Sequence, residues 1–281
     1  MSVFPLSGMG LEVEQSDFSW GSKVLLRTLG MIPGAMRNKM IFDGAPTDLL
    51  VQKAIQKCLG GPKPMRIRFT QSVLKGLRFE CQSSHKYFLL GTAFEQNFQR
   101  ELAELVDSND VVYDIGSHFG WWTLWFSVAA KFVVAFEPSP VNFQFLRRNI
   151  EANHRTNVEL HQVAASNSRG SISFVEDGSC SHVSLSSSPT DSVQVKTEQI
   201  DCFAGSHRPS LVKIDVEGHA SKVLEGMADT LEQIRPRLLM EIHDPTEESG
   251  VRGILSQHTY KITEQARRSY PKRVLAFPES N

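Results

Sequence analysis

The stretch VYDIGSHFG, residues 112–120, carries a short apolar run that leads into the spacing D-x-G-x-x-x-G. A run of this kind, at 111–115, is typical of a buried β-strand, and the apolar residues 121–130 that follow it are typical of a helix. Glycine allows the backbone to turn sharply and lets a ligand approach it closely. Because ligands of open α/β sheets lie at the carboxyl ends of the strands, this turn is predicted to form part of a ligand site.

Beyond this stretch, apolar strands alternate with amphipathic helices. The sequence predicts further strands at 132–136, 158–163, 211–216 and 237–242, helices at 141–153 and 221–234, and a last pair of strands at 259–263 and 273–277. Such alternation predicts a parallel sheet covered by helices on both faces, and the last pair would add an antiparallel hairpin. The expected fold class of residues 106–281 is therefore α/β.

Two segments depart from this alternation. Residues 1–105 form a mixed α/β region, with helices expected at 22–29, 47–59 and 96–105 and strands at 65–69 and 77–81. We treat this region as a first domain, and the sequence leaves three roles open for it: a cap over the site, a source of acceptor contacts, or a homodimer interface. Residues 170–200 are rich in serine and in turn residues, which predicts an antiparallel insertion near the mouth of the site, with a surface loop as the alternative.

Composition is that of an ordinary globular protein. With 41% hydrophobic and 22% charged residues and a formal net charge of −1, the chain offers no general attraction for nucleic acid or an anionic membrane. The four cysteines include no C-x-x-C pair, so zinc-binding spacing is absent. The apolar run 121–136 is too short for a membrane span, and Lys131 interrupts it. The first residues do not resemble a secretory signal, so we expect a soluble, cytoplasmic protein.

The glycine turn differs from a dinucleotide site. It lacks the triplet G-x-G-x-x-G that presents helix amides to a pyrophosphate, and Asp114, just before the first glycine, would repel one. A carboxylate there suits a cationic group, such as the ammonium of S-adenosylmethionine, directly or through water. Glu137 is spaced to accept hydrogen bonds from ribose hydroxyls, and the small Ala164 leaves room for adenine. The cofactor-binding candidates are Asp114, Gly116, Ser117, His118, Gly120, Glu137, Pro138, Ala164 and Asp215.

Polar residues gather at the ends of the fourth and fifth strands. Asp215 and Glu217 are two residues apart at the fourth strand, as are Glu241 and His243 at the fifth, so each pair shares a face. Asp215 is the candidate active-site carboxylate, His243 the first candidate base and His219 the second, an ordinary surface or core histidine being the alternative for both. The same donors could hold a divalent ion, but spacing across separate strands is weak evidence and no metal ligand is predicted.

Several motifs together resemble the FkbM-type methyltransferases. They are YDIG at 113–116, AFEPSP at 135–140, LVKIDVEG at 211–218, VLEG at 223–226 and GTAFE at 91–95, with Asn149 and Asn153 also similar. The resemblance implies a Rossmann-like class I methyltransferase fold, with a seven-stranded, mostly parallel sheet and a terminal antiparallel hairpin. It also implies S-adenosyl-L-methionine as cofactor and O-methylation of a hydroxyl on a sugar or natural product. We place Glu95, Glu217 and Glu241 on the side of this small-molecule or glycan acceptor.

The sequence departs from the family pattern at two positions. His118 stands where the family often has asparagine, and Ala220 stands where it usually has glutamate. The missing carboxylate leaves two alternatives open: a changed substrate, or a catalytically weakened scaffold that binds S-adenosylmethionine. A nucleotide-binding oxidoreductase on a related fold is a further alternative, which the absent glycine triplet disfavours. A nucleic-acid methyltransferase is disfavoured because no N-P-P-Y-like motif is present.

Overall fold

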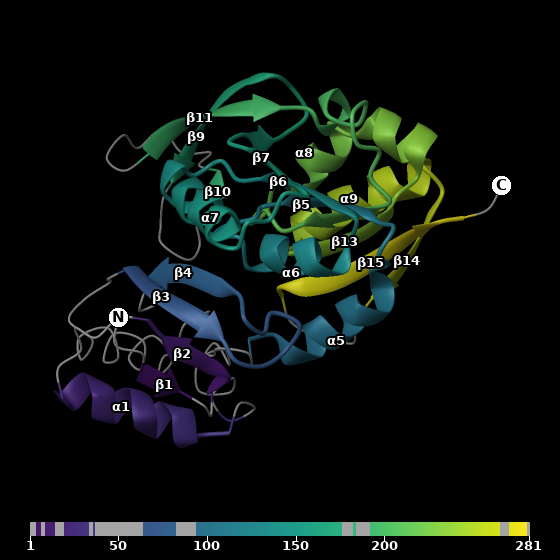
Figure 1. Ribbon diagram of the computed structural model, residues 1–281. Helices are drawn as coiled ribbons and strands as arrows, with labels where there is room; N and C mark the ends of the chain where they lie inside the picture. The colour runs from purple at the N-terminus through teal and green to yellow at the C-terminus, as the bar shows by residue number, and fades with distance from the viewer. Residues whose placement is uncertain are drawn as a thin grey trace. The chain divides into compact units, whose positions relative to one another are not determined.

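The computed structural model describes residues 4–6, 9–14, 20–33, 36, 64–82, 94–175, 182–183, 192–264 and 270–279 (Figure 1). The chain divides into two compact units. The first comprises Met1–Leu105 and Arg148–His154, and the second comprises Val106–Arg147 and Arg155–Asn281. The helix predicted at 47–59 lies outside the described residues.

A seven-stranded sheet organises the second unit, in the order β14-β15-β13-β12-β5-β6-β7 (Figure 1). The strands are β5 (Val111–Ile115), β6 (Phe132–Phe136), β7 (Val158–His161), β12 (Leu211–Ile214), β13 (Arg237–Ile242), β14 (Tyr260–Glu264) and β15 (Lys272–Pro278). The strands from β7 to β13 pair in parallel, and β15 pairs antiparallel with both β13 and β14. The predicted seven-stranded, mostly parallel sheet with a terminal antiparallel pair is therefore confirmed.

Helices connect these strands and bury their apolar residues. They are α6 (Trp121–Ala129), α7 (Pro140–Ala152), α8 (Ala220–Glu225) and α9 (Pro245–Gln257), with a 3₁₀ turn at Ile200–Cys202. One core cluster joins buried residues of the central strands to those of α8 and α9. Near-continuous apolar strands are what a parallel sheet covered on both faces requires. Among the described residues, no helix combines the length and apolarity needed to cross a membrane.

The helix predicted at 221–234 is interrupted. Helix α8 ends at Glu225, and a π-helical turn covers Thr230–Ile234. Gly226 lies at the break, where a Cβ would come within 1.9 Å of the carbonyl oxygen of Ser166. The chain therefore passes a distant carbonyl too closely for any side chain, and this contact cannot be predicted from helical periodicity.

Helix α9 was not among the elements predicted from the sequence. Its N-cap is Asp244, whose carboxylate accepts hydrogen bonds from the backbone N–H of Thr246 at 2.7 Å and of Glu247 at 2.9 Å, and a proline follows it. An aspartate cap followed by proline is a common helix start. Val251 and Leu255 are buried on the inner face of the helix, and Ile254 packs against the same core.

The serine-rich segment forms a second sheet in the order β10-β9-β11-β8. Its strands are β8 (Ala164–Ala165), β9 (Gly170–Val175), β10 (His182–Val183) and β11 (Ser192–Glu198). Strand β9 pairs antiparallel with β10 and β11, and β11 pairs in parallel with β8. The expected antiparallel pairing of this insertion is therefore confirmed for its described residues.

The first unit contains an antiparallel sheet in the order β1-β2-β3-β4. Its elements are β1 (Phe4–Leu6), β2 (Leu11–Val13), α1 (Trp20–Met31), β3 (Pro64–Phe69), β4 (Arg78–Gln82) and α5 (Gln96–Leu105). The last turns of α7 belong to this unit. Asn149 accepts a hydrogen bond from the N–H of Glu80 and donates one to its carbonyl, and Asn153 does the same at Arg78. Two asparagines one helical turn apart thus bind the backbone of the edge strand β4.

Candidate active site

The glycine turn after β5 lies against the end of β12. Gly116 has a φ of +80°, and a Cβ there would lie 1.8 Å from the backbone oxygen of Asp215. Gly120 has a φ of +85°, and a Cβ there would lie 2.6 Å from a side-chain carbon of α7. Gly116 therefore requires glycine, because another residue would be strained and would overlap the backbone of Asp215. At Gly120 the positive φ is the reason, since the neighbouring atom is the end of a flexible side chain. The turn packs directly against the strand end that carries the candidate carboxylate.

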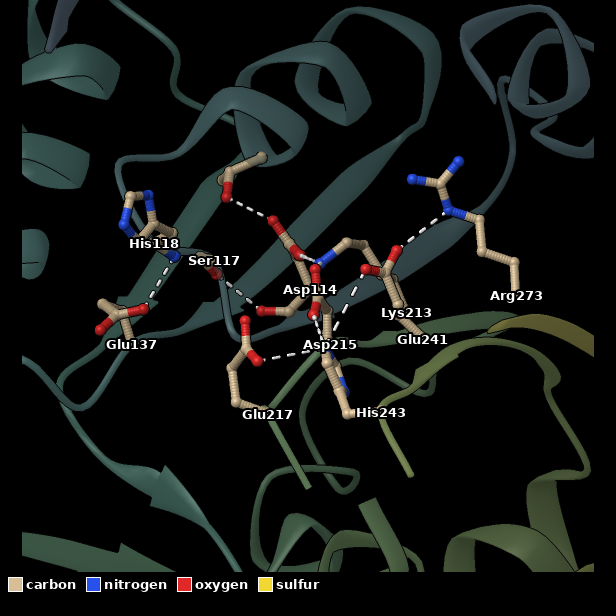
Figure 2. A network of polar contacts seen from close by, with 11 residues as sticks. Asp114, Ser117, His118, Glu137, Lys213, Asp215, Glu217, Glu241, His243 and Arg273 are labelled. Carbon is tan, nitrogen blue, oxygen red and sulfur yellow. Dashed lines mark hydrogen bonds and ion pairs between the residues drawn. The ribbon is translucent and has the colours of Figure 1, made fainter. Parts of the chain in front are cut away.

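Glu137, at the end of β6, faces this turn (Figure 2). Its Oε2 accepts a hydrogen bond from the N–H of His118 at 2.7 Å, and its Oε1 accepts one from the N–H of Ser139 at 2.9 Å. Burial is the largest influence on the Glu137 pKa and raises it to about 7, although these hydrogen bonds lower it. His118 has a φ of +53°, a left-handed conformation that histidine and asparagine adopt more readily than most residues, so this departure from the family pattern leaves the turn intact.

Asp114 on β5 and Lys213 on β12 lie side by side in the sheet, and both are buried (Figure 2). Lys213 Nζ lies 3.2 Å from Asp114 Oδ1 and 3.7 Å from Asp215 Oδ2. Thr123 donates its hydroxyl to Asp114 Oδ2 at 2.6 Å. Protein groups therefore surround the Asp114 carboxylate, and its predicted contact with a ligand cation, directly or through water, stays a prediction. Lys213 was not among the predicted site residues, because it reads in the sequence as one residue of a buried strand.

Side chains from the ends of β12 and β13 converge on His243 (Figure 2). Its Nε2 lies 3.3 Å from Glu217 Oε2, 3.7 Å from Asp215 Oδ1 and 4.0 Å from Glu241 Oε1. Burial lowers the His243 pKa, but Glu247 and the three other carboxylates outweigh it and raise the pKa to about 9. The four residues predicted at this rim are thus brought together, and the imidazole holds its proton at neutral pH.

Two residues absent from the sequence predictions hold this rim in place. Glu247 of α9 is buried, and its carboxylate accepts hydrogen bonds from the N–H of Ala220 at 2.8 Å and of His243 at 2.7 Å. Arg273 of β15 places Nε 3.1 Å from Glu241 Oε2. The helix-start signal just before Glu247 could have pointed to that residue. No local signal marks Arg273, because its contact depends on the pairing of β13 with β15.

His219, the second candidate base, is in the opposite charge state. Its Nε2 lies 3.1 Å from Ser166 Oγ. Burial lowers the His219 pKa from its ordinary value, and nearby Lys222 lowers it further. The imidazole of His219 is therefore neutral where that of His243 is charged.

The remaining candidates occupy varied positions. Ser117 donates its hydroxyl to the Asp114 carbonyl at 2.7 Å, Ala164 is buried in β8, and Pro138 is half-buried after β6. Glu95 belongs to the first unit and has a φ of +47°, and its acceptor-side role stays a prediction.

A possible metal group also lies at this rim. Within the described ranges, Asp215, Glu241 and His243 place one potential ligand atom each within 4.8 Å of the others. Acidic side chains often gather without an ion, and we assign none.

Comparison with known proteins agrees with this architecture. A family model described as the methyltransferase FkbM domain matches residues 114–262. The chain is 33% identical to the hexuronic acid methyltransferase AglP of Haloferax volcanii over 166 residues, 58% of this chain and 68% of that protein. It is 24% identical to Methyltransferase 1 of Beauveria bassiana over 194 residues, 59% of this chain and 75% of that protein.

A solved structure, the methyltransferase FkbM of Methylobacillus flagellatus KT, matches with a TM-score of 0.46 and 19% identity over 68% of this chain. The match covers 52% of that chain, so the present chain spans about half of its length. The family match over more than half of the chain confirms the resemblance seen in the motifs. This chain belongs to the FkbM family of methyltransferases.

Proposed function

We propose that this protein uses S-adenosyl-L-methionine to methylate a hydroxyl group on a sugar or a natural-product-like small molecule. The observation that carries the proposal is the convergence of Asp215, Glu217, Glu241 and His243 at the carboxyl edge of the parallel strands. This edge is where open α/β sheets bind their ligands. A rim rich in carboxylates supports a ligand with a positive charge, such as a sulfonium donor.

The chain's residues fit an adenosyl ligand in two respects. The Glu137 carboxylate is held toward the glycine turn by two backbone N–H groups and, when ionised, can accept hydrogen bonds from ribose hydroxyls. Gly116 lets the turn pack against the backbone of Asp215, which brings the turn and the candidate carboxylate to the same edge of the sheet. When bound, S-adenosylmethionine supplies a methyl group already activated on a positively charged sulfur.

The residues at the rim then have two tasks: to align the acceptor oxygen with the methyl group and to remove its proton. Neutral His219 and the partly exposed carboxylate of Asp215 can each take up a proton. Protonated His243 can donate a hydrogen bond to the acceptor oxygen, and it becomes a base only after losing its proton. We therefore place proton removal first at Asp215 or His219.

A sugar is the acceptor class with the best support. AglP, which shares 33% of its residues with the aligned part of this chain, is named a hexuronic acid methyltransferase. With alanine at position 220, the start of α8 still has a hydrogen-bond acceptor, because the Glu247 carboxylate accepts a hydrogen bond from the N–H of Ala220.

Calorimetric titration with S-adenosylmethionine, S-adenosylhomocysteine and NADH tests the cofactor. We expect both adenosyl ligands to bind, NADH not to bind, and Glu137→Ala to weaken binding by about tenfold because it removes a charged hydrogen-bond acceptor. Glu232→Ala is the matched control, since that side chain is 69% exposed. If a folded protein bound neither adenosyl ligand, the proposal would be wrong, and NADH binding would support an oxidoreductase instead.

An acceptor screen tests the reaction itself. Neutral glycosides, amino sugars, hexuronic acids and polyphenols would be incubated with S-adenosylmethionine, and release of S-adenosylhomocysteine would be measured. Turnover with a hydroxylated acceptor supports O-methylation. Tight cofactor binding without turnover on any acceptor would favour the scaffold alternative.

A further inference from the structure

Lys213 is a buried cation to which the proposed methyl transfer assigns no role. It faces Asp114 across the pairing of β12 with β5, and its side chain is only 5% exposed. An ammonium group in such a place needs compensating charge, because the interior solvates it poorly. Two carboxylates supply that charge: Asp114 at 3.2 Å and Asp215 at 3.7 Å from Nζ (Figure 2).

The two carboxylates differ in what else they can reach. Asp114 has no exposed surface, and its second oxygen receives the hydroxyl of Thr123 at 2.6 Å. The side chain of Asp215 is 32% exposed, and its second oxygen lies 3.7 Å from His243 Nε2. Asp215 therefore has surface available for a ligand, whereas Asp114 has none.

The charge of this trio is not balanced. Burial lowers the Lys213 pKa, but Asp114 and then Asp215 raise it above its ordinary value, so the ammonium stays charged. One ammonium between two carboxylates leaves one negative charge. Because Asp114 makes the closer pair with Lys213 and is enclosed, the remaining negative charge lies on the side open to ligand, where Asp215 shares the protonated His243 with Glu217 and Glu241.

We propose that Lys213 is a positioning residue that neutralises Asp114 and holds the Asp215 carboxylate toward the cationic part of the bound methyl donor. This inference rests on the proposed use of S-adenosylmethionine. It places the direct contact with the ligand cation at Asp215 rather than at Asp114, which the sequence pattern predicted to meet that cation directly or through water. Asp114 then serves as the buried counter-ion that keeps Lys213 in place.

A set of variants separates these roles, with S-adenosylhomocysteine binding measured by calorimetry and folding followed by thermal unfolding. We expect Lys213→Met to weaken binding by about tenfold or more, because it leaves a buried carboxylate unpaired and Asp215 undirected. Lys213→Arg should recover most of the affinity, since it restores the cation. The double variant Asp114→Asn with Lys213→Met should bind more tightly than Lys213→Met alone, because no buried charge is left unpaired. Lys131→Met is the matched control, as that lysine is exposed and lies between α6 and β6.

The pH dependence supplies a readout that a merely structural lysine would not change. In Lys213→Met, the unpaired Asp114 should take up a proton at a higher pH than in the wild type. Binding of S-adenosylhomocysteine by this variant should therefore vary between pH 5 and 8 in a way that the double variant does not. If Lys213→Met does not fold, Lys213→Arg and the double variant are compared instead. Weaker binding by the double variant supports the positioning role, and equal binding overturns it.

Three results separate the possible errors. Wild-type affinity in Lys213→Met would overturn the positioning role. A double variant that binds less tightly than Lys213→Met would show that Asp114 itself contacts the ligand, as the sequence pattern suggested. Failure of the wild-type protein to bind S-adenosylhomocysteine would refute the proposed function and this inference with it, whereas normal wild-type binding with either of the first two results refutes the inference alone.

Discussion

Glu137 should make the stability of this protein depend on pH in an unusual direction. Burial raises its pKa from 4.5 to about 7. Between these two values the folded chain holds a proton that the unfolded chain has released. Stability therefore falls as pH rises from 4.5 and is fully reduced above 7, and the difference corresponds to about 3 kcal/mol. The usual paired carboxylate has the opposite effect, because its pKa is depressed on folding.

Glu137→Gln isolates this effect, since glutamine does not titrate. Urea unfolding of both proteins between pH 4.5 and 8 should show wild type losing about 3 kcal/mol relative to the variant. The lost acceptor for the N–H of His118 or Ser139 adds only an offset that is constant with pH. A stability difference that stays flat across this range would refute the reasoning. Because ribose hydroxyls favour the ionised form, adenosyl ligands should also release about half a proton on binding near pH 7, which calorimetry in buffers of different ionisation enthalpy measures.

Three further substitutions test local packing and hydrogen bonding within the two units. Gly116→Ala should destabilise the fold by about 3 kcal/mol or more and weaken cofactor binding, because this position has a φ of +80° and an added Cβ would overlap the Asp215 backbone. Gly205→Ala is the control: an added Cβ there meets no atom within 4 Å, so stability should change by less than about 0.5 kcal/mol. Asp244→Ala should cost about 1 kcal/mol through loss of the α9 N-cap, measurable by urea unfolding. Asn149→Ala should cost about 2–4 kcal/mol and raise amide exchange in β4, since it leaves two backbone groups of strand β4 without their partner; unchanged exchange there would contradict the contact.

The seven-stranded sheet could be predicted because its strands are apolar runs whose length and spacing do not depend on distant contacts. Residues 111–115 and 132–136 form β5 and β6 with the predicted bounds. The interruption at Gly226 could not be predicted in this way, because the deciding feature is the approach of the distant Ser166 carbonyl. Helix α9 did carry a local signal, the Asp244 cap followed by proline, which the sequence prediction missed.

The candidate site shows the same limit. Sequence spacing placed Asp215 and Glu217 on one strand and Glu241 and His243 on the next, and the structure brings them together because the strands are parallel neighbours. The role of Lys213 depends on its register with Asp114, which only pairing of β12 with β5 sets. The sequence thus shows which side chains lie at a strand end, but not which residue of the neighbouring strand sets their charge state.

The two histidines show why this distinction matters for mechanism. Both follow strand ends in the sequence, and nothing local separates them as proton acceptors. In the structure, carboxylates raise the His243 pKa to about 9, while burial and Lys222 lower that of His219. A general base must be unprotonated when the acceptor binds, so His219 meets that condition at neutral pH before any ligand is present. A cationic donor beside Asp215 and Glu217 would weaken the same carboxylate field that holds the proton on His243. The donor would thereby move His243 toward the form that accepts a proton, so the order of the two histidines as bases depends on whether the methyl donor is bound.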